Sequence, residues 1–208
     1  MLSYFSFIGT ALLLILSPGI DTALVTKNTI TNSAKGGLFT AIGISTGVVV
    51  HTLFTALGLS VILMQSSHLF HVVKIIGAIY LIYLGVGSFR KIQHGQSLQP
   101  ASYEVNSNLS YLSLFRQGLI TNVLNPKVAL FFFTFLPQFV SKEGIFFYQI
   151  LLLGFTYATL TLAWFLCYLF VMGKFEAWFK KSTVQLTMEK VTGAVLVFLG
   201  LKLMMTRS

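Results

Sequence analysis

The chain has 208 residues, of which 55% are hydrophobic and only 9% are charged. Soluble domains carry roughly 25% charged residues, so this composition leaves too little polar surface for a fold in water. The mean hydropathy of +0.83 supports the same conclusion. We therefore expect a single membrane-embedded domain over residues 1–208, with the lipid bilayer as its solvent.

The formal net charge is +9, from 14 Lys and Arg against 5 Asp and Glu. The basic residues stand at the ends of apolar segments and form no basic stripe or RNA-binding motif. This pattern fits loops beside an anionic cytoplasmic leaflet and argues against a nucleic-acid partner. The single cysteine, Cys167, excludes an internal disulfide, and no Cys/His cluster is present. We expect neither a metal site nor a cofactor.

The sequence contains no H-E-x-x-H motif and no Walker phosphate-binding loop. We therefore do not expect an enzyme. Because the chain lacks a nucleotide-binding loop, any transport by it would use an ion gradient rather than ATP.

Six apolar segments are long enough to cross a bilayer, which requires about 20 residues per helix. They cover roughly residues 3–26, 38–64, 69–90, 113–136, 145–172 and 185–205. Each must be helical, because backbone polar groups cannot remain unpaired in hydrocarbon. The first segment lacks the basic start and the cleavage site of a signal peptide, so we expect it in the mature protein. The expected fold class is an all-α integral membrane protein with six transmembrane helices.

The connections between these segments alternate in charge. The odd-numbered connections carry Lys27 and Lys35, then Arg90 and Lys91, then Lys174, Lys180 and Lys181, whereas the second has no Lys or Arg and the fourth has Lys142 beside Glu143. The positive-inside rule then places both termini on the non-cytoplasmic side. Lys202 and Arg207 near the C-terminus weigh mildly against this orientation.

A polar stretch, residues 94–110, is predicted to be a linker between two half-repeats, residues 1–93 and 111–208. Lys35-Gly36-Gly37-Leu38-Phe39 resembles Lys142-Glu143-Gly144-Ile145-Phe146 at an offset of 107 residues, and Pro18 precedes Pro126 by 108. With three helices in each half, the second copy would be upside down. This 3+3 inverted repeat is typical of secondary transporters.

Two of the apolar segments are interrupted at corresponding places. One reads Leu16-Ser17-Pro18-Gly19-Ile20-Asp21 and the other reads Asn122-Val123-Leu124-Asn125-Pro126-Lys127. Proline removes a helical hydrogen bond, and Ser or Asn before it is a helix-start signal. We predict a helix break at Pro18 and Gly19 and another at Pro126. A simple proline kink is the alternative, but two interruptions in register favour a binding site.

Charged and polar residues beside these breaks are the candidate site. Charge inside the bilayer costs at least ~2.5–3.5 kcal/mol, so Asp21 and Lys127 are expected to have a use there. Asp21 could hold a substrate ammonium, carry a proton, pair with Lys127, or lie near the membrane interface. The start of a half-helix favours a carboxylate, which we expect near Asn125–Lys127. His51 could relay protons or could be a hydrogen-bonded packing histidine. The remaining candidates for substrate or proton binding are Ser17, Thr22, Thr121 and Asn122.

These motifs make the sequence similar, along nearly its whole length, to the LysE/RhtB family of bacterial amino-acid exporters. The resemblance is carried by the motif at residues 17–21, by Gly43, Gly47 and His51, by residues 74–85, and by Phe115-Arg116-Gln117-Gly118 continuing through Asn125-Pro126-Lys127 to Phe135-Leu136-Pro137-Gln138-Phe139. The resemblance implies six transmembrane helices, an inner-membrane location and proton-coupled efflux of amino acids or derivatives. It also implies that the family's acid is Asp21. Ile20 stands where the family usually has a second proline.

The hypothesis from sequence is therefore a proton-coupled exporter with alternating access, whose partners are a small-molecule substrate, protons and the lipid bilayer. Two alternatives remain open, namely a membrane scaffold or partner subunit without transport, and an inorganic-ion exporter. The oligomeric state is also open, a homo-oligomer included.

Overall fold

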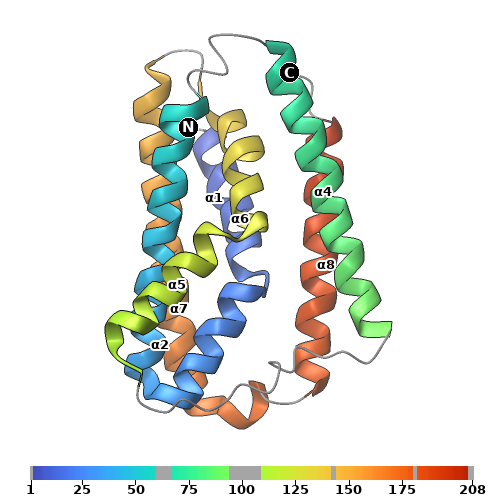
Figure 1. Cartoon of the computed structure of the whole chain (residues 1–208). Coiled ribbons are helices and arrows are strands. Elements are labelled where there is room, and N and C mark those ends of the chain that lie inside the picture. The colour runs from blue at the N-terminus through green and yellow to red at the C-terminus, as the bar shows by residue number, and fades with distance from the viewer. Residues whose placement is uncertain (1, 60–66, 94–108, 142–143, 180–181, 206–208) are drawn as a thin grey trace.

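The computed structural model describes residues 2–59, 67–93, 109–141, 144–179 and 182–205, which are almost entirely helical (Figure 1). In chain order the helices are α1 (Leu2–Leu16), α2 (Ile20–Phe54), η1 (Thr55–Leu59), α4 (Ser67–Gln93), α5 (Tyr111–Val123), α6 (Pro126–Leu130), η2 (Phe131–Phe135), η3 (Leu136–Phe139), α7 (Phe146–Phe179) and α8 (Ser182–Met205). None of the described residues forms a strand, so the all-α fold class expected from the sequence is confirmed for them.

Helix α2 is interrupted by a kink in its first half. Asn32 (φ −130°, ψ 24°) and Ser33 (φ 70°, ψ 173°) leave the helical conformation, and the chain reverses direction there (Figure 1). A straight helix of 35 residues would be about 53 Å long, far more than a hydrocarbon core of about 30 Å. The kink divides α2 into two shorter helices, each of which fits within the thickness of the hydrocarbon core. The connection expected between the first two apolar segments is therefore a tight turn.

The fourth apolar segment is bent rather than straight. Helix α5 ends at Val123, and α6 begins at Pro126 after two non-helical residues. The path Tyr111–Val123 plus Pro126–Phe139 bends by 48° at this break. Beyond α6 the helix widens into the π-helix η2 and then tightens into the 3₁₀-helix η3.

Several helices have the length and apolar character of membrane spans. Among the described residues, Phe146–Met172 meets both criteria, as does Ile20–Gly58, which contains the kink in α2, and the bent α5–η3 path is a third candidate. Large apolar side chains also cover the outer surface, among them Phe5, Leu57, Leu124, Ile145, Phe170 and Met205. A soluble monomer rarely exposes so much apolar surface, so these side chains fit contact with lipid.

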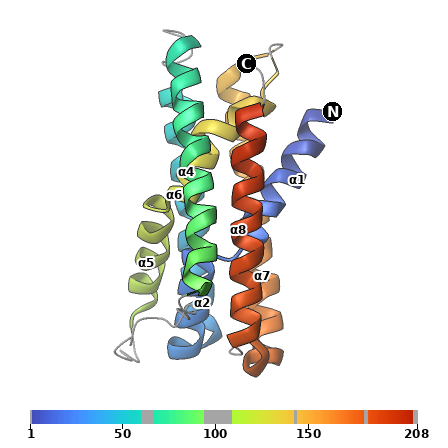
Figure 2. The same ribbon diagram turned by 90° about the vertical axis from the view of Figure 1, so that its right-hand side faces the viewer.

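The helices form two packed groups. Helix α2 packs against α5 and α7, and α4 packs along α8 (Figures 1 and 2). Both termini lie at one end of the molecule, whereas the kink in α2 and the ends of α4 and α7 lie at the other (Figure 1). The expected linker, residues 94–110, falls outside the described residues except for Leu109 and Ser110, and Ser110 caps the start of α5.

Glycines allow these helices to approach closely. A Cβ at Gly43 of α2 would overlap the carbonyl group of Phe115 on α5, and a Cβ at Gly118 of α5 would overlap the carbonyl of Thr40 on α2. In the other group, a Cβ at Gly85 would lie 2.7 Å from the Gly193 carbonyl, and one at Gly193 would lie 2.9 Å from the Gly85 carbonyl. Small residues at helix crossings are typical of packing in membranes.

Replacing Gly43 by alanine should destabilise the protein, because the added methyl group meets backbone that cannot move aside. We expect a loss of about 1–3 kcal/mol, the usual cost of overpacking, seen as a lower midpoint of thermal unfolding in detergent. Gly87→Ala is the matched control, since nothing lies within 4 Å of a Cβ there. Equal midpoints for the two variants would contradict this packing.

Candidate functional site

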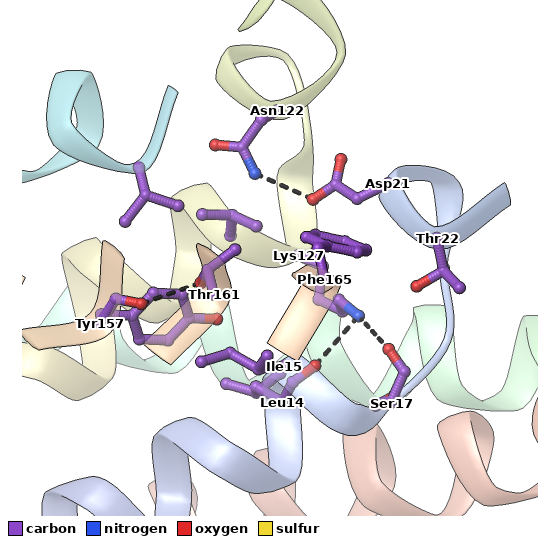
Figure 3. A pocket seen from close by; sticks show the side chains of 13 residues that line it. Leu14, Ile15, Ser17, Asp21, Thr22, Asn122, Lys127, Tyr157, Thr161 and Phe165 are labelled. Atoms are coloured by element: carbon purple, nitrogen blue, oxygen red, sulfur yellow. Dashed lines mark hydrogen bonds between the residues drawn. The ribbon is translucent and has the colours of Figure 1, made fainter. Parts of the chain in front are cut away.

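The two helix breaks contact each other at the centre of the molecule. The first lies at residues 17–19, between α1 and α2, and the second lies at residues 124–125, between α5 and α6. Side chains from each break reach the other, as described below (Figure 3). Residues about 100 positions apart in the sequence therefore form one site.

Asp21 lies in the first turn of α2 and reaches the second break. Its Oδ2 atom accepts hydrogen bonds from Asn122 Nδ2 (2.8 Å) and Asn125 Nδ2 (3.1 Å). Its Oδ1 atom is buried and has no hydrogen-bond partner in the described part of the chain. One oxygen thus fixes the carboxylate, and the other can accept a proton or a bond from an ammonium group.

Lys127 reaches the first break, where it caps the end of α1. Its ammonium group donates to the carbonyls of Ser17 (2.8 Å) and Leu14 (3.3 Å) (Figure 3). The last carbonyls of a helix lack intrahelical partners and carry the negative end of its dipole, so a cation suits this place. Thr192 of α8 donates in the same region to the Pro18 carbonyl (2.7 Å).

No ion pair joins Asp21 and Lys127 among the described residues, although the sequence left that pairing open. The ammonium of Lys127 donates to carbonyls, and the carboxylate of Asp21 accepts from amides. Each charged group is therefore stabilised by dipoles from the opposite break.

The two half-helix starts differ in how they are capped. At the start of α6, Asn125 Oδ1 accepts from the Lys127 backbone N–H (3.0 Å). At the start of α2, Gly19 has no side chain that could cap the helix. The first N–H groups of α2 therefore receive no hydrogen bond from a capping side chain. A Cβ at Gly19 would lie 3.2 Å from Lys127 Nζ. The helix start left open to an anion is therefore that of α2, whereas the sequence favoured the one at Asn125–Lys127.

His51 caps the end of the other broken helix. Its Nε2 atom lies 3.0 Å from the Asn122 carbonyl, and its ring stacks on Phe132 with centroids 5.7 Å apart. A carbonyl can only accept a hydrogen bond, so Nε2 must carry a proton. His51 thus serves the end of α5 as Lys127 serves the end of α1.

The breaks border a cavity of about 20 Å³, which has room for about one water molecule and not for an amino acid. Of the residues expected from the sequence, the lining includes Ser17, Gly19, Asp21, Thr22, Asn122 and Lys127 (Figure 3). Ser17 and Asn122 are almost fully buried, and the Ser17 hydroxyl has no hydrogen-bond partner in the described residues. Polar atoms in this cavity are therefore available to a ligand.

Thr121, also expected in the site, does not line the cavity. Successive residues of an α-helix point about 100° apart, so the orientation that brings Asn122 to the cavity turns Thr121 away.

Helix α7 supplies one wall of the cavity that sequence reasoning missed. Tyr157, Thr161 and Phe165 line it at intervals of four residues (Figure 3). This spacing places them on one face of the helix. They lie inside a long apolar segment without a break or a charge, so no motif marks them.

Two groups of packed side chains lie along the helices on either side of the cavity. Toward the kink in α2, Asn28 donates to Thr40 Oγ1 (2.9 Å) and Gln117 Oε1 (3.2 Å), which joins the first part of α2 to α5. Toward the N-terminus, the buried rings of Phe7, Phe131 and Tyr157 pack together, with centroid separations of 6.3 Å and 5.0 Å. We name these two groups the polar closure and the aromatic closure.

Residues 43–47 match the G-x-S-x-G pattern of hydrolases, but not its structural context. That motif requires a sharp strand-to-helix turn that exposes the serine. Here Ser45 lies within α2, and its hydroxyl donates to the Ala41 carbonyl (3.0 Å). Gly43 and Gly47 of the motif serve helix packing. The described residues also contain no group of three His, Cys, Asp or Glu side chains that could hold a metal.

The sequence profile of the LysE type translocators matches residues 12–207. The chain belongs to this family. The match covers both breaks and both charged residues of the site, so the resemblance seen in the sequence is confirmed. Translocators of this family are membrane transporters rather than enzymes, which places this chain among bacterial membrane proteins.

Relatives of this translocator include proteins with and without a known role. An uncharacterized membrane protein of Bacillus subtilis, YrhP, is 35% identical over 97% of this chain and 98% of its own length. The leucine efflux protein of Salmonella typhimurium is 29% identical over 67% of this chain and 64% of its own length. An uncharacterized membrane protein of Vibrio cholerae is 25% identical over 96% of this chain and 95% of its own length. No solved structure gives a significant match.

Removing the Thr192 hydroxyl should destabilise this translocator, because the Pro18 carbonyl would lose its hydrogen bond from α8 in a buried region. For Thr192→Val we expect a loss of about 1–3 kcal/mol, measured as a lower thermal midpoint in detergent. Thr159→Val is the control, since that exposed hydroxyl donates only within its own helix. A Thr192→Val protein as stable as the control would contradict the capping role.

Proposed function

We propose that this translocator is a secondary active exporter of amino acids in the inner membrane of a bacterium, driven by the inward flow of protons. The observation that carries the proposal is the carboxylate of Asp21, which has one buried, unpartnered oxygen beside the uncapped start of α2. Membership of the family and the similarity to a leucine efflux protein support amino acids as the substrate class.

The arrangement suits a zwitterion bound at the first turn of α2. The substrate carboxylate would accept from the free N–H groups after Gly19, with the Lys127 ammonium beside it. The substrate ammonium would donate to Asp21 Oδ1 and to the Ser17 hydroxyl. The ammonium and the carboxylate of an α-amino acid are attached to one carbon and therefore lie close together. Two binding positions within one helical turn match this short separation.

Competition at Asp21 would couple export to protons. A carboxylate that faces an ammonium has its charge compensated, and a protonated carboxyl group needs no compensation. Without either, the charge would rely on two amide donors in the membrane, which is costly. Asp21 would therefore take up a proton as the substrate leaves. Asn122 and Asn125 would hold the carboxyl group in place through the cycle.

We also propose that residues 1–93 and 111–208 are the two halves of a 3+3 inverted repeat, with residues 94–110 as the linker. The reciprocal contact of Gly85 and Gly193 supports this, since their offset of 108 residues equals that of Pro18 and Pro126. Residues related by a two-fold axis contact each other in this reciprocal way. Alternating access would require the polar and the aromatic closures to open in turn.

Both termini would lie outside the cytoplasm. The kink in α2, which precedes Lys35, and the end of α7 lie at the end of the molecule opposite the termini (Figure 1). The positive-inside rule assigns that basic end to the cytoplasm.

The strongest alternative is a membrane scaffold that does not transport. It requires Asp21 and Lys127 to be structural, so neutralising both at once would leave the protein functional. The separate partners of the two residues argue against a structural ion pair. An inorganic-cation exporter is a weaker alternative, because Asp21 is the one acid among the described residues that lines the cavity, and hard cations require several oxygen ligands.

Asp21→Asn should strongly reduce proton-driven transport, while the size of the side chain hardly changes. In proteoliposomes with an imposed pH gradient, we expect transport of leucine to fall at least about tenfold, since a charge-assisted hydrogen bond contributes about 1.5–3 kcal/mol. Asp21→Glu keeps the charge and should retain more activity. Unchanged gradient-driven transport by a folded Asp21→Asn protein would refute the coupling role.

Two substitutions of His51 separate proton relay from helix capping. His51→Gln keeps an N–H donor for the Asn122 carbonyl but cannot titrate, whereas His51→Leu removes the donor. If capping is the role, His51→Gln should transport at about the wild-type rate and His51→Leu should lose both stability and transport. Equal loss of transport in two stable variants would favour the relay instead.

A further inference from the structure

The charged side chains that line the cavity, among the described residues, are one acid and one base. Of its lining residues, Asp21 and Lys127 carry charged side chains. Under the proposed function, the ammonium and carboxylate that every α-amino acid carries would occupy the places beside these two residues. Among the described residues, no third charged side chain lines the cavity to pair with a charge on the substrate side chain.

The rest of the lining is mainly apolar. It includes Ile15, Val48, Val128 and Phe165, which come from four different helices. Phe165 is almost fully buried and belongs to a hydrophobic cluster that also contains Ile44. The hydroxyl of Thr161 already donates to the Tyr157 carbonyl (2.9 Å), so it is not a free donor for a polar substrate group.

We propose that this translocator selects amino acids with uncharged aliphatic side chains, and that Phe165, Ile15 and Val48 form the side-chain subsite. The inference rests on the proposed function and narrows its substrate class. A lysine or glutamate side chain would bring an unpaired charge into an apolar, membrane-embedded wall, which is strongly unfavourable. An aliphatic side chain would bury apolar surface there as the cavity opens to admit it.

A competition assay tests the substrate class directly. The purified full-length protein is reconstituted in liposomes loaded with leucine, and uptake of labelled leucine is measured against external leucine, isoleucine, methionine, lysine and glutamate. We expect the aliphatic amino acids to compete at least about tenfold better than lysine and glutamate. Equal competition by lysine or glutamate would overturn this inference and leave the proposed export of amino acids standing. If none of these amino acids is transported when each is loaded in turn, the proposed function itself fails.

Variants of Phe165 test the subsite. Phe165→Ala should raise the KM for leucine about tenfold with a smaller change in kcat, because it removes contact area for the side chain. Phe155→Ala is the matched control on the same helix, where the ring is 48% exposed, and its KM should stay at the wild-type value. Phe165→Leu preserves most of the packing, so it provides a second test if the Phe165→Ala protein does not fold. It should shift the ranking toward amino acids with larger side chains. A folded Phe165 variant with wild-type KM values for the whole panel would refute the subsite.

Discussion

Carbonyl groups released by two helix breaks find partners on distant segments of the protein, and these contacts organise the centre of the translocator. An unsatisfied N–H or C=O in hydrocarbon costs several kcal/mol. Lys127 and Thr192 serve the end of α1, and His51 serves the end of α5. Each of these three side chains lies at least 71 residues along the chain from the carbonyl group that it contacts. The breaks therefore hold distant segments together, and the same groups that stabilise the fold surround the cavity.

What could be predicted from the sequence was local. Proline removes a hydrogen bond wherever it stands in a helix, so the interruptions at Pro18 and Pro126 follow from the residues alone. The capping role of Asn125 also follows, because Asn before Pro is a helix-start signal. The capping bond joins its side chain to a backbone N–H only two residues further along the chain. For His51 the sequence allowed a relay or a packing role. Its bond to the Asn122 carbonyl fits a hydrogen-bonded packing histidine, and the identity of that partner depends on where α5 ends.

What could not be predicted depends on how the helices pack. Lys127 bonds to carbonyls of α1 because α6 lies against that helix, and no pattern in either segment encodes the contact. Tyr157 and Phe165 lie in a segment of unbroken hydrophobicity, where every face of the helix looks alike in the sequence. Gly47 illustrates the cause, since a Cβ there would lie 2.7 Å from Asn122 Oδ1. A missing side chain on α2 thus decides which residue of α5 reaches Asp21, and one-dimensional periodicity does not carry that information.

The two closures of the cavity differ in what it costs to open them. The bonds of Asn28 to Thr40 and Gln117 can be exchanged for bonds to water, at a net cost of about 0.5–1.5 kcal/mol each. Separating Phe7, Phe131 and Tyr157 exposes apolar surface, at about 25 cal/mol per Å². In the proposed cycle the polar closure would therefore open to the cytoplasm with little help, and the aromatic closure would need a bound ligand to stabilise its open form. An exporter with this asymmetry would load from the cytoplasm readily and would resist opening outward while empty, which limits leakage of protons through the carrier.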